Sequence, residues 1–201
     1  MIHCELFRTA RLAPVELPAA ESPAPHAVAS AAPDGAAPFR CQLPFVMQKQ
    51  AQDNWCWAAV SVSVAAFYSP ASTWTQPDLV SHGLKNPACA TDGSSPACDI
   101  SWALDKALGL TKHLHTWNNG VAPVHTLRSE LGAKRPIGCR IEWNGGGAHF
   151  VAITGYHDDG VNQGITVDDS CNGRSHVDLA AFPAVYHHHG GTWSHHYLTH
   201  P

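Results

Sequence analysis

The stretch Trp55–Tyr68, WCWAAVSVSVAAFY, decides how the rest of the chain is interpreted. Its central residues 60–64 alternate valine with serine, which is typical of a half-buried strand. The apolar residues between Ala59 and Tyr68 also recur at helical spacing, and the run is longer than an ordinary strand. We therefore predict a helix over residues 56–68.

Cys56 would be the first residue of this helix. The unpaired N–H groups at a helix N-terminus favour negative charge, so a cysteine there is more readily a thiolate, the nucleophilic form. The alternative is a buried, inert thiol between Trp55 and Trp57, because free cysteines are among the most buried residues. The rest of the sequence has to decide between these interpretations.

The remaining pattern divides the chain into a helical half and a strand half. Further helices are expected from Thr75-Gln76-Pro77 onward, over Ser101–Leu108 and over Pro123–Leu131, with a short strand over Leu43–Met47. The second half changes to strand periodicity, with expected strands over Ile137–Trp143, His149–Tyr156, Ile165–Asp169 and Thr192–Thr199. Helices followed by antiparallel strands indicate an α+β fold.

Residues 12–38 are rich in alanine and proline and have no helical or strand period. Such a composition buries too little apolar surface to offset the entropy of ordering. We predict that residues 1–41 are a flexible segment, a leader or a plain tail, and that residues 42–201 are the globular domain. The first ten residues lack the apolar core of a standard secretory signal.

Composition argues against several classes of function. The chain has 201 residues, a formal net charge of −4 and a pI of about 6.4. It contains no basic run that would suit nucleic acid. It has no apolar stretch near the roughly 20 residues that a membrane span needs. We therefore expect no nucleic-acid partner and no membrane.

Two later segments supply partners for a nucleophile. His149 follows the glycine-rich residues 144–148 and opens a strand, a suitable position for a general base. Asp168 and Asp169 end the next strand, where a carboxylate could orient the histidine ring. Asp169 shares a face with Val167 and is the preferred third member, although Asp168 stays open as an alternative.

Gln50 lies six residues before Cys56 and could donate an amide N–H to an oxyanion, although Gln48 and Gln52 lie nearby. The histidines near the C-terminus are mostly consecutive and do not have metal-ligand spacing, so we expect no metal and no cofactor. Seven cysteines leave at least one thiol unpaired. Cys89 and Cys98 flank a turn and are either a disulfide or two free thiols.

Several segments together resemble the bacterial papain-like family typified by a plant-pathogen avirulence effector peptidase. They are Gln48 and Gln50, the segment 55–59, Arg140–Val151 with its three glycines before His149, Val167–Asp169, and Gly190–Trp193. The resemblance implies a papain-like fold in which an N-terminal helical subdomain carries the nucleophile and packs on a C-terminal antiparallel sheet. It also implies a Cys56-His149-Asp169 triad completed by Gln50. One departure is Ser170, where the family often has proline.

The resemblance further implies a cysteine endopeptidase that is a secreted bacterial effector or toxin and cuts proteins of a target or host cell. Export would use a dedicated secretion system, and a toxin acting on bacteria would have an immunity protein as partner. Two alternatives remain at this stage. One is an amidase or acyltransferase of the same fold that acts on peptidoglycan or another amide, and the other is an inactive papain-like binding module.

Overall fold

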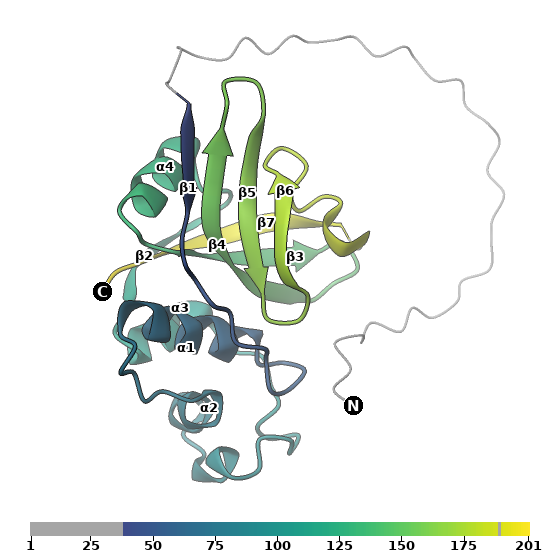
Figure 1. The fold of residues 1–201 in the computed structure, drawn as a ribbon. Coiled ribbons are helices and arrows are strands. Elements are labelled where there is room, and N and C mark those ends of the chain that lie inside the picture. The colour runs from purple at the N-terminus through teal and green to yellow at the C-terminus, as the bar shows by residue number, and fades with distance from the viewer. Residues whose placement is uncertain (1–37, 189) are drawn as a thin grey trace, which may run out of the picture.

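The predicted helix over residues 56–68 forms in the computed structural model, which describes residues 38–188 and 190–201. In that part of the chain, the helices are α1 (Cys56–Tyr68), α2 (Gln76–Leu84), α3 (Leu104–Leu110) and α4 (Val124–Gly132), with short 3-10 turns η1 (Pro87–Ala90) and η2 (Tyr186–His188). The strands are β1 (Phe39–Gln42), β2 (Leu114–Asn119), β3 (Ile137–Trp143), β4 (Ala148–Asp158), β5 (Gln163–Asp169), β6 (Gly173–Asp178) and β7 (Gly191–Thr199). The helices α1, α2 and α3 gather on one side of a twisted antiparallel sheet, whereas α4 lies apart from them, beside β1 and β4 (Figure 1). The α+β prediction is confirmed.

Burial explains why α1 has an ambiguous sequence pattern. Its first ten residues are all buried, so apolar residues are needed on every side of the helix. The two serines satisfy their hydroxyls within the helix: Ser61 donates to the carbonyl of Trp57 at 2.8 Å, and Ser63 donates to that of Ala59 at 2.6 Å. Such bonds to the preceding turn let a hydroxyl enter a core. The Val-Ser alternation therefore belongs to a buried helix and does not indicate a strand.

The sheet has the strand order β2-β7-β3-β4-β5-β6, and β1 pairs with the C-terminal part of β4. All pairs are antiparallel. β3 and β4 form a hairpin in which Ile141 lies opposite His149. Gly146 and Gly147 have φ values of +92° and +81° in the connecting turn, a conformation that favours glycine. This turn holds His149 at the start of a central strand, with α1 packed against β4.

The other predicted helices form with small shifts of their ends. Thr75 caps α2, and its hydroxyl accepts from the N–H of Asp78 at 3.2 Å. The helix predicted over 101–108 begins later, at Leu104, because residues 101–103 are an extended loop beside α1. α4 starts directly after Pro123, as predicted.

The predicted strand over Leu43–Met47 was wrong. The N–H of Leu43 donates to the carbonyl of Thr154 at 2.8 Å, but Pro44 has no N–H with which to continue the ladder. The strand lies just before this segment, as β1, which places residues 39–41 in the sheet. The rest of the predicted flexible segment, residues 1–37, lies outside the described residues. No helix in the described chain has the length and apolarity to cross a membrane.

Cys89 and Cys98 form a disulfide, which answers the question that the sequence left open. The closed loop packs against the start of α1. The indole N–H of Trp55 donates to the carbonyl of Cys98 at 2.8 Å, and that of Trp57 donates to the carbonyl of Ile100 at 3.1 Å. Both indoles are buried, so these two bonds fix the tryptophans on either side of Cys56.

We predict that the double substitution of Cys89 and Cys98 by serine lowers the free energy of unfolding by about 2–3 kcal/mol, because the unfolded chain gains loop entropy. Urea denaturation followed by tryptophan fluorescence measures this change. An unchanged unfolding midpoint would contradict the stabilising role given to this loop.

Candidate active site

Cys56 is the first residue of α1 and is buried, with 8% of its surface exposed. Trp55 precedes it with no side-chain cap, and no acidic residue lies in the first turn of the helix. The positive end of the helix dipole is therefore not neutralised by a neighbouring carboxylate, which favours a thiolate at this position. The helix start predicted at Cys56 is confirmed.

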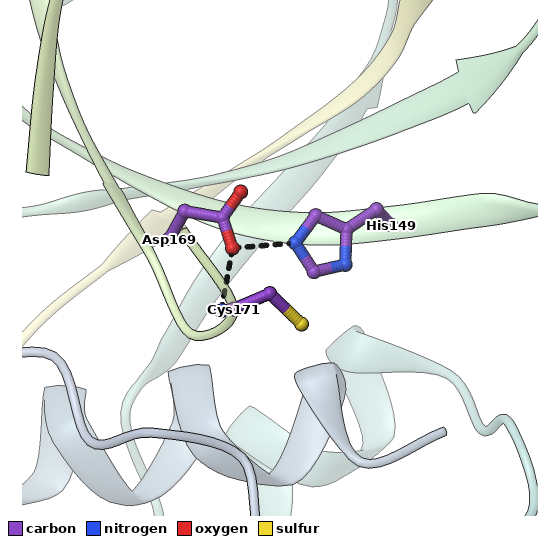
Figure 2. Close-up of side chains that lie close together, drawn as sticks. All are labelled: His149, Asp169 and Cys171. Atoms are coloured by element: carbon purple, nitrogen blue, oxygen red, sulfur yellow. Dashed lines mark hydrogen bonds and ion pairs between the residues drawn. The ribbon is translucent and has the colours of Figure 1, made fainter. Parts of the chain in front are cut away.

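His149 and Asp169 are directly hydrogen-bonded. The Nε2 atom of His149 lies 2.8 Å from Oδ1 of Asp169, and both side chains are largely buried. Figure 2 shows the ring facing Asp169 through this nitrogen, with Nδ1 turned away from the carboxylate and toward the helical layer. The ring thus joins the sheet to α1: one nitrogen binds the acid, and the other lies on the side of Cys56.

The two adjacent acids have separate partners. Asp168 forms an ion pair with Arg174 at 2.9 Å and accepts from the hydroxyl of Thr154 at 2.6 Å. Asp169 points to the other side of β5 and meets His149. The alternation of side chains along a strand separates the two carboxylates. The structure therefore brings Asp169 to the histidine and leaves Asp168 in a salt bridge.

The charges of the site support a protonated His149. Burial lowers the pKa of His149, but the hydrogen bond to Asp169, the interaction with the Cys56 sulfur and the negative charge of both groups outweigh burial and raise the pKa to about 10. The raised pKa favours the protonated imidazole. A protonated imidazole beside a cysteine is the partner that a nucleophilic thiolate requires.

Asp169 is held by several donors besides His149. The N–H of Cys171 donates to it at 2.7 Å, the side-chain amide of Asn172 at 3.0 Å and the hydroxyl of Tyr186 at 3.2 Å. Burial raises the pKa of Asp169, but His149, Asn172 and the N–H of Cys171 lower it below its ordinary value. The sequence did not reveal Asn172 or Tyr186, because neither follows a recognisable spacing from the histidine.

Gln50 is buried near the start of α1, but its amide already has protein partners. Its Nε2 donates to the carbonyls of Gln52 at 2.9 Å and Asp53 at 2.7 Å, and its Oε1 accepts from the hydroxyl of Ser170 at 2.8 Å. Ser170, the residue where the family pattern departs, therefore links the segment after Asp169 to the segment before Cys56. An oxyanion bound by Gln50 would accept from the same Nε2 group that donates to the carbonyls of Gln52 and Asp53.

A cleft of about 460 Å³ opens beside Cys56. One wall is the loop 101–103, which includes Trp102, and the opposite wall is the turn that leads to His149. The floor is the sheet, through side chains of β3, β4 and β7. The cleft therefore offers a site where an extended ligand would pass over the thiol.

One group of residues in the described chain has the arrangement of potential metal ligands: His149, Asp169 and Cys171, whose ligand atoms lie within 4.8 Å of one another. Cys171 is disulfide-bonded, so it offers no thiolate. The other two groups are already bonded to each other. These residues do not fit a metal, and the C-terminal histidines of the described chain form no such group.

The sequence matches the model of one protein family. The family model described as papain-like cysteine protease AvrRpt2 matches residues 39–187. Among solved structures, the chain is similar to digestive procathepsin L 3 of the Tenebrio molitor larval midgut, with a TM-score of 0.49 and 14% identity. This match covers 85% of the present chain and 72% of the other. No curated protein matches the sequence.

We predict that Asp169→Asn lowers the pKa of His149 from about 10 toward its ordinary value, because the substitution removes a negative charge from the ring. Titration of the His149 ring by NMR measures the shift. Asp168→Asn is the matched control and should leave the His149 pKa unchanged, since Asp168 pairs with Arg174. The reverse pattern would assign the orienting role to Asp168.

Proposed function

This chain belongs to the papain-like cysteine protease AvrRpt2 family and is a cysteine peptidase, and we propose that it is an endopeptidase with a Cys56-His149-Asp169 triad. The observation that carries this assignment is the 2.8 Å bond between His149 and Asp169, on a ring that also interacts with the sulfur of Cys56. The three residues come from α1, β4 and β5, far apart in the sequence. Cys56 lines the cleft, as do Gly147 and Ala148, the two residues before His149.

In the proposed reaction, His149 stabilises the Cys56 thiolate, and the sulfur attacks the carbonyl carbon of the scissile peptide bond. The bond electrons move to the carbonyl oxygen, which becomes an oxyanion. The imidazolium of His149 then gives its proton to the leaving amine as the C–N bond breaks. Water hydrolyses the remaining thioester with His149 as base. Asp169 keeps the ring in place through both steps.

The oxyanion would be stabilised by the backbone N–H of Cys56 at the start of α1 and by the side-chain amide of Gln50. The N–H of Cys56 lies in the first turn of the helix, where no preceding turn supplies a carbonyl acceptor. Gln50 would contribute by sharing its Nε2 between the oxyanion and the carbonyls of Gln52 and Asp53. Its bond to Ser170 fixes the amide orientation, with the nitrogen toward the segment that precedes α1.

We further propose that the protein is a secreted bacterial effector or toxin, delivered by a dedicated secretion system, and that it cleaves proteins inside a target or host cell. The resemblance of its motifs to an avirulence effector peptidase supports this proposal. A version that acts on bacteria would need an immunity protein in the producing cell. Comparing the proteomes of cells exposed to the wild type and to Cys56→Ala would identify the substrates.

We predict that Cys56→Ala abolishes proteolysis while the fold survives, because the substitution removes only the sulfur and keeps Cβ at the start of α1. His149→Ala should have the same effect, and Asp169→Ala should cost less. Cleavage of an unfolded protein such as casein measures activity, and circular dichroism measures folding. Cys41→Ala is the control, because this partly buried thiol lies at the far end of the sheet and should be dispensable.

Full activity of Cys56→Ala would overturn the proposal. Cleavage of peptidoglycan fragments in place of casein would replace it with an amidase of the same fold.

A further inference from the structure

The cleft beside Cys56 continues across the sheet beyond the proposed triad. Its floor contains Phe150 of β4, Arg140 of β3, and His195 and Tyr197 of β7. The strand register puts Phe150 opposite Arg140, and Arg140 opposite His195. Residues that face each other in an antiparallel pair lie on the same face of the sheet. These side chains therefore form one row. It begins at Phe150, the residue after His149, and leads across the sheet toward β7.

The next strand in this direction is β2, which has a single neighbour in the sheet, β7. On β2, Trp117 lies opposite Tyr197, so its side chain is on the face of the cleft floor. The Trp117 ring centroid lies 5.5 Å from that of His195 and 6.5 Å from that of Tyr197. An aromatic surface thus runs without interruption from the cleft to the edge of the sheet.

Trp117 is the exposed end of this surface. It is 44% exposed, whereas Phe150 and Tyr197 are 7% and 5% exposed. A large, amphipathic ring that remains in water at the end of a cleft is a common anchor for a polypeptide partner. The ring contacts with His195 and Tyr197 restrict its motion, so little side-chain entropy is lost on binding.

We infer that Trp117 forms a remote subsite that binds an apolar or aromatic side chain of an extended polypeptide substrate. The inference rests on the proposed peptidase function. From β4 to β2 there are three steps between strands, or about 14 Å, which an extended chain spans with about four residues. The substrate residue bound by Trp117 therefore lies about four positions from the scissile bond. The substrate class is an unfolded or extended segment, since such a chain reaches from β4 to β2.

Digestion of a random peptide library, with peptides long enough to reach from Cys56 to Trp117, tests the subsite. The wild type should enrich apolar or aromatic residues at one position about four residues from the cleavage point. Trp117→Ala should lose that enrichment and keep the preferences next to the scissile bond. For a long peptide chosen from the library, the kcat/KM of Trp117→Ala should be about tenfold below that of the wild type. The loss should come mainly from a higher KM, because apolar contact with the ring is lost.

Two variants separate recognition from a structural role of the ring. Trp117→Phe retains an aromatic face and should keep the positional preference. Asn118→Ala changes the adjacent exposed residue of β2, on the opposite face of the strand, and should leave the profile unchanged. A peptide shortened to end before the remote position should be cleaved equally by the wild type and Trp117→Ala.

An unchanged positional profile in Trp117→Ala overturns the subsite while the peptidase proposal stands. A library that is not cleaved by the wild type, or that is cleaved equally by Cys56→Ala, overturns the peptidase proposal and the subsite with it.

Discussion

The hydrogen bond between His149 and Asp169 joins the neighbouring strands β4 and β5 and holds the ring that interacts with the sulfur of Cys56. Both partners are largely buried, and α1 packs against β4. A buried carboxylate is costly unless it is paired, and Asp169 is paired with an imidazolium and with donors from the loop that follows it. The same charge raises the pKa of His149, the residue next to the Cys56 sulfur. The chemistry proposed for the thiol therefore depends on this one interaction.

Much of this arrangement could be predicted from the sequence, because it depends on local patterns. The bounds of α1 and β3 follow from apolar periodicity, and the strand that His149 begins follows from its nearly continuous apolar run. The strand expected over Leu43–Met47 failed because Pro44 ends the ladder that β1 begins. β2 and β6 were missed because their residues are largely exposed and lack an alternating apolar pattern. Edge strands of this kind are defined by their pairing partners.

The site residues also divide into those that the sequence predicts and those that it does not. Cys56, His149 and Asp169 could be named from motifs, but the choice between Asp168 and Asp169 needed the strand pleat and the position of Arg174. The contacts of Tyr186 and Ser170 arise from tertiary packing, so no local sequence pattern predicts them. Ser170 stands where the related family often has proline, and its hydroxyl holds the amide of Gln50. The residue that departs from the family pattern thus makes a side-chain contact with Gln50.

The central claim is that Cys56 is held as a reactive thiolate by His149. Iodoacetamide labelling near pH 6, followed site by site with mass spectrometry, tests it most directly. Burial raises the pKa of the Cys139 thiol and of the Cys41 thiol, so both should react slowly. We predict that Cys56 reacts about a hundredfold faster than either, and that His149→Ala removes this advantage. Equal labelling of the three thiols, or fast labelling of Cys56 in His149→Ala, would contradict the account.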